Sequence, residues 1–345
     1  MKTKKKKFRI EISGEFFCQG MEMIGKNPGK TLVVTAGVHG REYVGIQTLF
    51  TFAEDILREE INGRLILIPV VNEEGFYQGS RQIVPADGIN LNRAFPGDIH
   101  GTRTWRLAAA LETCLYPKAD FLLDLHGGDD NEMAMAFVYF SACAGTGVTE
   151  ASRRAASSLS VSVRTASSAR NGLYSQAAQR GIPSLLLERG GGGLWSAEEI
   201  KECKKNIREL MVHLGMIQED EKGESKTWKN KRNMARKDKE TEAGKEQREI
   251  LRTEYLRFPA DGIWYPSVTA GQHLKAGDII GELYGMDGEL IHRYKAKQAG
   301  IVLYYTTALG VRAGDSLAAI GKLESHLPLE VAAGADGEDV SGVYE

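Results

Sequence analysis

The chain has 345 residues, of which 42% are hydrophobic and 26% are charged, and its formal net charge at pH 7 is -2. This length exceeds the usual size of one domain and predicts a large domain with a smaller one attached. The charge does not indicate nucleic-acid binding, and no apolar run approaches the ~20 residues that span a bilayer. We therefore expect a cytoplasmic protein that binds neither nucleic acid nor a membrane, and its oligomeric state stays open.

The cysteines give no sign of a metal or redox site. Cys18, Cys114, Cys143 and Cys203 are widely spaced and form no Cys-x-x-Cys pair. That spacing disfavours disulfides and thiolate zinc sites and favours buried thiols.

Short apolar runs alternate with stretches of helical period from residue 31 to about residue 214. The runs predicted as buried strands are Thr31–Thr35, Leu65–Val71, Phe121–Leu125 and Ser184–Leu187. The stretches predicted as helices are Tyr43–Leu57, Trp105–Leu115 and Ala197–Leu214. This alternation predicts an α/β domain over residues 1–217, with a mainly parallel central sheet flanked by helices. In such sheets, ligands bind at the carboxyl ends of the strands.

A histidine and a glutamate follow the first predicted strand. His39 and Glu42 are three residues apart at the start of a helix, so both side chains lie on one face and can bind a single ion. On its own, His-x-x-Glu also occurs as a capped helix start with a surface glutamate. The pair therefore needs a third ligand from elsewhere in the chain.

The loop over residues 79–97 is rich in turn-forming residues and contains two arginines. Arg81 lies near its start, and Asn92 and Arg93 are flanked by apolar residues. A guanidinium group binds a carboxylate through two hydrogen bonds, and an asparagine can add another donor. Arginines also serve as surface ion pairs, but an apolar-flanked Asn-Arg pair favours substrate binding.

A third candidate ligand ends a buried strand. His126 follows Phe121–Leu125, and two glycines turn the chain after it. In a parallel sheet this end borders the same crevice as the first strand-helix turn, so His126 can join His39 and Glu42. Three protein ligands leave a position open for water, as in catalytic zinc sites. Asp124 either orients His126 or is a structural carboxylate, and His126 alone could be a core histidine.

An activated water also needs a proton acceptor, for which Glu188 is the candidate. This glutamate follows the predicted strand Ser184–Leu187 and precedes Arg189 and four glycines, so a ligand can approach it closely. The alternative is a Glu188–Arg189 pair beside a flexible loop.

The composition changes after the predicted α/β domain. Residues 218–250 are mostly charged and are predicted to form a linker. Residues 251–324 are rich in glycine and strand-like, and a similar motif ending in Ala-Gly-Asp occurs at 271–278 and 310–315. We expect a small all-β domain of barrel-sandwich type there, and a flexible tail over residues 325–345.

Four ordered motifs resemble the succinylglutamate desuccinylase/aspartoacylase family, a branch of the zinc carboxypeptidase fold. They are His39-x-x-Glu42, Asn90-Leu-Asn-Arg93-x-Phe-Pro-Gly, His126 and Glu188. The resemblance covers about residues 31–214, and the all-β segment is similar to the C-terminal domain of this family. It implies one zinc ion per chain, held by His39, Glu42 and His126, with Glu188 as general base and then general acid.

The resemblance also implies roles in substrate binding. Arg81 would polarise the scissile carbonyl and stabilise the oxyanion, while Asn92 and Arg93 would bind a substrate carboxylate. Tyr174 resembles the tyrosine that closes the substrate pocket.

Two positions depart from the family pattern. Asn90 stands where aspartoacylase-like members have Asp, although Asp87 lies nearby, and Ala178 stands where they have an arginine. One carboxylate clamp is thus absent unless Arg170 or Arg180 replaces it. We therefore do not expect specificity for N-acetylaspartate or succinylglutamate.

The leading functional prediction is a zinc-dependent hydrolase that cleaves the amide bond of an N-acylated amino acid or a related small substrate with a carboxylate. The first alternative is a zinc carboxypeptidase that acts on peptides. The second is a catalytically reduced binding protein on this scaffold. The acyl group and the amine stay open.

Overall fold

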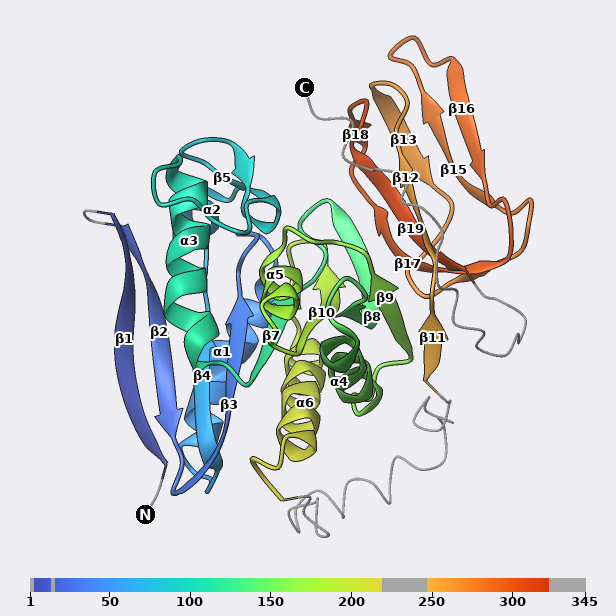
Figure 1. The fold of residues 1–345 in the computed structure, drawn as a ribbon. Helices are drawn as coiled ribbons and strands as arrows, with labels where there is room; N and C mark the ends of the chain where they lie inside the picture. Colours follow the sequence, from blue (N-terminus) through green and yellow to red (C-terminus); the bar gives the residue numbers. More distant parts are fainter. Residues whose placement is uncertain (1–2, 14–15, 219–246, 323–345) are drawn as a thin grey trace.

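The computed structural model describes residues 3–13, 16–218 and 247–322 (Figure 1). Its N-terminal part contains a twisted sheet flanked by helices. The strands are β1 (Lys4–Ser13), β2 (Phe16–Ile24), β3 (Asn27–Ala36), β4 (Asn62–Ile68), β7 (Phe121–His126), β8 (Glu132–Ser141), β9 (Val163–Ser167) and β10 (Ser184–Gly191). The order is β1-β2-β4-β3-β7-β10-β8, and β9 also pairs with β8.

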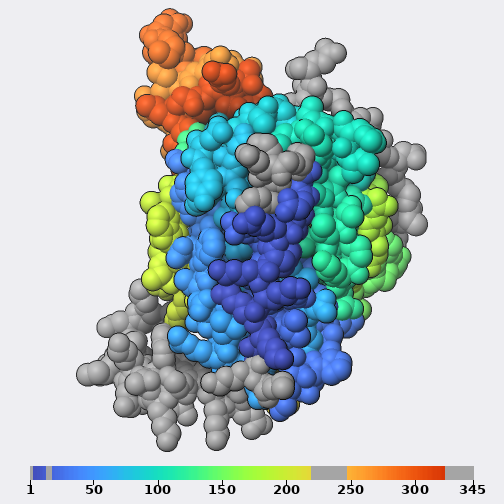
Figure 2. Space-filling view, turned by 90° about the vertical axis from the view of Figure 1, so that its left-hand side faces the viewer, coloured from blue at the N-terminus to red at the C-terminus, as the bar shows by residue number. Residues whose placement is uncertain are grey.

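The sheet is mixed rather than mainly parallel. β4, β3, β7 and β10 run parallel, as predicted, but β8 is antiparallel to β10, and the hairpin β1–β2 adds two antiparallel strands at one edge. Viewed from that edge, β1 lies on the surface and the C-terminal strands lie at one end of the molecule (Figure 2). The predicted α/β class is confirmed, and β1, β2, β8 and β9 were not predicted.

Helices cover both faces of the sheet. They are α1 (Tyr43–Ile56), α2 (Glu73–Gln78), α3 (Arg103–Leu115), α4 (Thr146–Ser157), α5 (Leu173–Gln179) and α6 (Ala197–His213). One apolar core joins α1, α4 and α6 to one face, and a second joins α3 and α5 to the other. The loop before α3 contains the short strands β5 (Ile83–Val84) and β6 (Ile89–Asn90) and the 3-10 turn η1 (Leu91–Arg93), and η2 (Tyr116–Lys118) follows α3.

The C-terminal part consists of two facing sheets. Its strands are β12 (Thr253–Arg257), β13 (Gly262–Pro266), β14 (His273–Leu274), β15 (Ile279–Tyr284), β16 (Leu290–Lys295), β17 (Gly300–Thr306), β18 (Gly310–Val311) and β19 (Ser316–Lys322). The sheet β16-β15-β13-β18 shares an apolar core around Phe258 and Trp264 with strands β17, β19 and β12. A sandwich of this kind matches the predicted all-β unit.

The repeated Ala-Gly-Asp motif forms the same turn twice. Gly277 and Gly314 both have positive φ, near 90°. In each copy the aspartate, Asp278 or Asp315, accepts a hydrogen bond from the backbone N–H three residues earlier. The repeated motif therefore forms two equivalent turns, since glycine adopts positive φ without steric cost.

The two parts share one sheet. β17 pairs with β8, and Thr307 N donates to Asn131 O at 2.8 Å. Strand β11 (Arg248–Ile250), at the end of the predicted linker, pairs with β9, and its Ile250 is buried. The rest of that linker, residues 219–246, and the predicted tail over 325–345 lie outside the described residues.

Candidate active site

Three potential metal ligands converge at the carboxyl ends of β3 and β7. His39 lies in the turn after β3, Glu42 begins α1, and His126 ends β7. His39 Nδ1 lies 2.6 Å from Glu42 Oε1, and His126 Nδ1 lies 2.9 Å from Glu42 Oε2. All three residues are less than 10% exposed, and their ligand atoms lie within 4.8 Å of one another.

The hydrogen bonds around the two histidines fit a metal site. His39 Nε2 lies 3.2 Å from Asn90 Oδ1, and His126 Nε2 lies 3.0 Å from Asp124 Oδ2. Because both oxygens act as acceptors, they favour a proton on Nε2 and leave the Nδ1 lone pairs directed at Glu42. Two imidazoles and one carboxylate with a remaining open position are the donor set of a catalytic zinc site.

The two acceptors are themselves held in place. Asp124 Oδ1 accepts a hydrogen bond from Thr35 Oγ1 at 2.6 Å, and Asn90 Oδ1 also accepts one from Asn92 N at 2.8 Å. Asp124 therefore orients His126, which was one of its two predicted roles. Asp87 does not replace Asn90 beside His39, because its carboxylate binds Thr102 and Thr104 at the start of α3.

The ionisation of the cluster follows from its burial and its charges. Burial opposes ionisation of Glu42, but His39 and His126 hold its pKa at about 2. Burial also opposes the charged form of His126, yet Glu42 and Asp124 raise its pKa well above the usual value. A metal ion that binds at Nδ1 therefore competes with a proton.

Glu188 lies beside this cluster. It pairs in register with His126 across the parallel strands β10 and β7. Burial raises the pKa of Glu188 to about 8. His126 opposes this shift, and the carboxylates of Glu42 and Asp124 add to it. The Glu188–Arg189 pair is not formed, since Arg189 instead donates to Glu199 at 3.0 Å and points toward α6.

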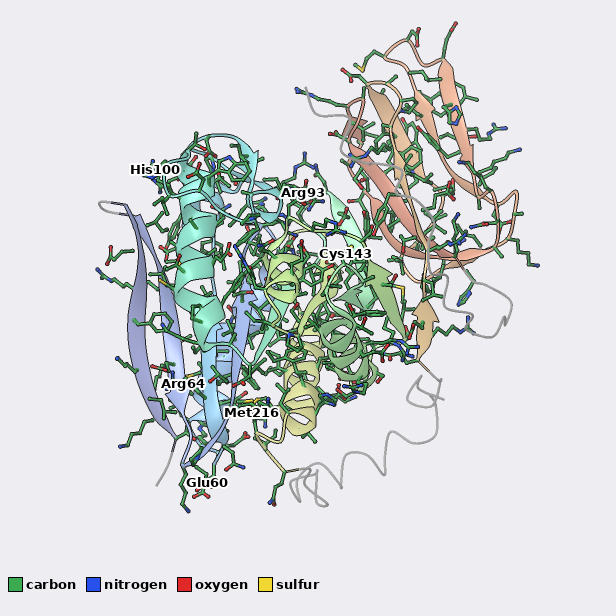
Figure 3. All side chains as sticks on the ribbon, viewed as in Figure 1. Glu60, Arg64, Arg93, His100, Cys143 and Met216 are labelled. Atoms are coloured by element: carbon green, nitrogen blue, oxygen red, sulfur yellow. The ribbon has the colours of Figure 1, made fainter. Side chains whose placement is uncertain are left out.

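Two exposed arginines face the site from the loop before α3. Neither Arg81 nor Arg93 forms an ion pair with any residue that the structure describes. Arg93 lies at the end of the sheet opposite Arg64, on the side of the C-terminal strands (Figure 3). Asn92 is buried, and its Oδ1 accepts a hydrogen bond from Leu173 N at 3.1 Å. This bond connects η1 to α5. The amide N–H groups of Asn92 therefore remain as its donors toward a ligand.

A group of tyrosines surrounds Glu188, and only Tyr174 among them was predicted. Tyr174 is 3% exposed, and its phenol has Glu188 and Arg93 among its charged neighbours. Tyr139 on β8 and Tyr255 on β12 place their hydroxyl oxygens 3.2 Å apart, and Glu188 is near both. Tyr304 on β17 also has Glu188 as a neighbour. Burial raises the pKa of each of these phenols, so all are neutral donors at neutral pH.

Sequence reasoning missed Tyr139 because it did not predict β8, and it missed Tyr255 and Tyr304 because it did not place the predicted all-β unit beside Glu188. The apolar run Phe137–Phe140 could have indicated β8. Nothing in the local sequence indicates that β12 and β17 reach Glu188, since that contact depends on the docking of distant strands.

Ala178 stands where the family pattern has an arginine, and it is buried. This alanine is 1% exposed. Arg180 pairs with Glu112 at 2.6 Å beside a shallow hollow on the outer face of α3, and Arg170 is exposed with no ion pair among the described residues. Arg180 is therefore not available as a second carboxylate clamp.

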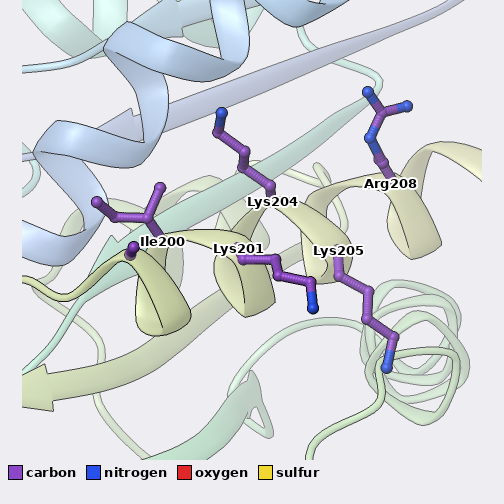
Figure 4. A pocket seen from close by; sticks show the side chains of 6 residues that line it. Ile200, Lys201, Lys204, Lys205 and Arg208 are labelled. Carbon is purple, nitrogen blue, oxygen red and sulfur yellow. The ribbon is translucent and has the colours of Figure 1, made fainter. Parts of the chain in front are cut away.

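A basic hollow on α6 lies apart from these groups (Figure 4). Lys204 pairs with Asp55, and Lys205 lies close to Glu202 and Glu209. This helix face is a solvated set of ion pairs without catalytic side chains.

Known proteins resemble this chain in sequence. Residues 28–214 match the model of the succinylglutamate desuccinylase/aspartoacylase catalytic domain. The chain is 26% identical over 336 residues to N-alpha-acetyl-L-2,4-diaminobutyric acid deacetylase of Halomonas elongata, covering 92% of this chain and 91% of that protein. Within the described ranges, no helix combines the length and apolar character needed to cross a membrane.

Solved structures resemble the whole fold. The product-bound ectoine utilization protein EutE (DoeB) from Ruegeria pomeroyi has a TM-score of 0.75 and 25% identity over 89% of each chain. A succinylglutamate desuccinylase/aspartoacylase structure from Rhodobacter sphaeroides has a TM-score of 0.78 and 23% identity, covering 94% of this chain and 96% of that one. The sandwich at the C-terminus is thus part of an arrangement that these structures share.

Proposed function

This chain belongs to the succinylglutamate desuccinylase/aspartoacylase family, and we propose that it hydrolyses the amide bond of an N-acylated amino acid. The observation that carries the proposal is the buried cluster of His39, Glu42 and His126 beside the protonatable carboxyl of Glu188. Similarity to a deacetylase over 92% of the chain supports a small acylated substrate.

The three ligands would hold one zinc ion per chain. When bound, the ion would polarise the amide carbonyl and increase the acidity of a water molecule. Glu188 would accept the proton of that water and then donate it to the departing nitrogen. A carboxyl with a pKa raised toward neutrality can perform both transfers.

Substrate binding would involve the unpaired arginines. Arg93 would bind the carboxylate of the amino acid through its guanidinium fork, with the amide N–H groups of Asn92 as further donors. Arg81 would stabilise the negative charge that develops on the carbonyl oxygen. Tyr174 would line the pocket beside Glu188 and Arg93.

The experiment is an assay of the zinc-loaded protein against N-acetyl and N-succinyl amino acids and, in parallel, short peptides. We expect release of the acyl group from small acylated amino acids and little cleavage of peptides. Faster release of C-terminal residues from peptides would favour the carboxypeptidase alternative. A lack of turnover on both groups of compounds would favour a catalytically reduced binding protein. The cytoplasmic location stays a prediction.

A further inference from the structure

The side chain of Asn90, which stands where the family pattern has an aspartate, lies between the metal cluster and η1. Its Oδ1 lies 3.2 Å from His39 Nε2 and accepts a hydrogen bond from Asn92 N at 2.8 Å. Asn90 is the last residue of β6, and this second bond caps η1. One oxygen atom thus contacts a candidate metal ligand and the turn that carries Asn92 and Arg93.

These two contacts determine the orientation of the Asn90 amide. A backbone N–H can only donate, so the side-chain atom that Asn92 N meets must be the oxygen. The same oxygen faces His39 Nε2, which therefore carries the proton of the ring. The lone pair of His39 Nδ1 is then directed at Glu42, 2.6 Å away, on the side where an ion would bind.

The two histidines of the cluster are held by different parts of the fold. His126 belongs to β7, and its acceptor is the buried carboxylate of Asp124, to which Thr35 Oγ1 donates at 2.6 Å. His39 lies in the turn between β3 and α1, and its acceptor comes from the loop before α3. The two rings meet edge to face, with centroids 5.0 Å apart. The orientation of His39 therefore depends on a loop rather than on the central sheet.

The acceptor of His39 is also uncharged. Hydrogen bonds to an ionised acceptor are shorter and stronger than those to a neutral one. The contact between His39 and Asn90, at 3.2 Å, is longer than the one between His126 and Asp124, at 3.0 Å. The His39 ring is thus held less firmly than the His126 ring, and it would gain more from an ion bound at Nδ1.

The opposite side of η1 is attached to α5. Asn92 Oδ1 accepts a hydrogen bond from Leu173 N at 3.1 Å. A Cβ atom at Gly172 would lie 2.5 Å from the same oxygen, so the two segments are in close contact. On the side of the metal cluster, η1 is held by the hydrogen bond from Asn92 N to Asn90.

We infer that Asn90 is a positioning residue that couples the two halves of the site, so that metal binding at His39 orders the turn that carries Asn92 and Arg93. The inference rests on the proposed function, which assigns the metal to His39 and a substrate carboxylate to Arg93. With Nδ1 bound to an ion, the His39 ring would be fixed, and through it the Asn90 amide and η1. By reciprocity, a carboxylate that binds the ordered turn would also favour metal binding.

The first measurement is the zinc affinity of the wild type, Asn90→Ala and Asn90→Asp, by competition with a chromogenic chelator. Asn90→Ala removes the shared oxygen, so its affinity should fall about 10- to 100-fold, the usual effect of losing a group that orients a metal ligand. Asn90→Asp keeps an oxygen acceptor and a good cap, so it should bind zinc at least as tightly as the wild type.

The second measurement is amide hydrogen exchange over residues 91–94. In the wild type and in Asn90→Asp, saturating zinc should slow this exchange, because the N–H of Asn92 becomes more firmly bonded. In Asn90→Ala, saturating zinc should leave it unchanged. Asp87→Ala is the matched control, since it loosens the same loop at α3 through contacts that do not involve His39. Its zinc affinity and its response to zinc should match those of the wild type.

Neither measurement requires turnover, so the inference and the proposed function can fail separately. Unchanged zinc affinity in Asn90→Ala, or an equally large loss in Asn90→Asp, would overturn the inference. Exchange over η1 that does not respond to zinc in the wild type would also overturn it. If Asn90→Ala does not fold, weaker zinc binding by Asn90→Asp than by the wild type is the contradicting result. If both measurements agree with the inference but no acylated amino acid is hydrolysed, the proposed function fails and the coupling stands.

Discussion

At the scale of single residues, some charged side chains of the site have hydrogen-bonded partners and others have no ion pair. Glu42 lies between two histidines whose outer nitrogens are held by Asn90 and Asp124. Arg81 and Arg93, by contrast, form no ion pair within the described residues, although Asp129 and Glu132 are acidic neighbours of Arg81. In the proposed function, the groups held by these hydrogen bonds would bind the metal, and the two arginines would bind the substrate.

Arg93 should therefore select substrates with a free carboxylate. Arg93→Ala should lower kcat/KM by about ten- to a hundred-fold for the acid substrate, since a charge-assisted bidentate contact contributes about 1.5 to 3 kcal/mol. Arg93→Lys should restore only part of this loss, because lysine keeps the charge and lacks the fork. The check is a kinetic comparison of the acid with its neutral amide. Equal turnover of acid and amide by the wild type would exclude this role.

The convergence of the candidate residues was predictable because they lie at strand ends. His39 lies just after β3, His126 ends β7 and Glu188 lies in β10, and because these three strands are adjacent and parallel the residues meet at one edge of the sheet.

At the scale of elements, the loop before α3 carries the residues that we propose bind the substrate. Asp87 anchors this loop to the start of α3 through Thr102 Oγ1 at 2.5 Å, Thr104 Oγ1 at 2.5 Å and Thr104 N at 2.8 Å. Burial opposes ionisation of this carboxyl, but these hydrogen bonds lower its pKa below the usual value. The anchor is thus strongest when Asp87 is ionised.

Replacement of Asp87 should have a pH-dependent effect on stability. Because the folded pKa is lowered, the ionised carboxylate stabilises the fold above the unfolded pKa of about 3.9, and this contribution is lost as the pH falls through the folded value. Asp87→Ala should cost about 0.5 to 2 kcal/mol at pH 7, as for a lost helix cap, and much less near pH 3. Urea unfolding at both pH values checks this, with the exposed Asp98→Ala as control. An equal loss at both pH values would contradict the account.

For three of the strands that were not predicted from the sequence, the omission has a physical reason. β1 begins with four consecutive lysines, and as an edge strand it tolerates charges that obscure the alternation of a half-buried strand. β8 alternates alanine and methionine before its aromatic run, which is weak as a strand pattern. β11 has three residues, and Ile250 is its only buried side chain.

At the scale of the whole molecule, the C-terminal sandwich is structurally joined to the α/β part. β17 extends the central sheet at β8, and β11 pairs with β9. Tyr255 and Tyr304 bring two hydroxyl groups from this sandwich toward Glu188. The sequence predicted the sandwich itself from its glycine turns, but its docking depends on contacts between distant segments.

A chain that ends at residue 218 should consequently fold poorly. It lacks β17 and β11, so the edges of β8 and β9 would be open to pairing with other chains. We expect aggregation in size-exclusion chromatography, and loss of activity in any monomer that remains. A monomeric, fully active fragment would show that the sandwich is dispensable.

The most direct test of the account is the paired measurement of zinc content and turnover in Glu188→Gln, with His126→Ala as its comparison. Glu188 acts on water and the leaving nitrogen in this account, whereas His126 holds the metal. Glu188→Gln should keep about one zinc per chain and lose on the order of 10²- to 10⁴-fold in kcat. His126→Ala should lose both the zinc and the activity. Near-normal turnover by Glu188→Gln, or full zinc occupancy in His126→Ala, would contradict the proposed mechanism.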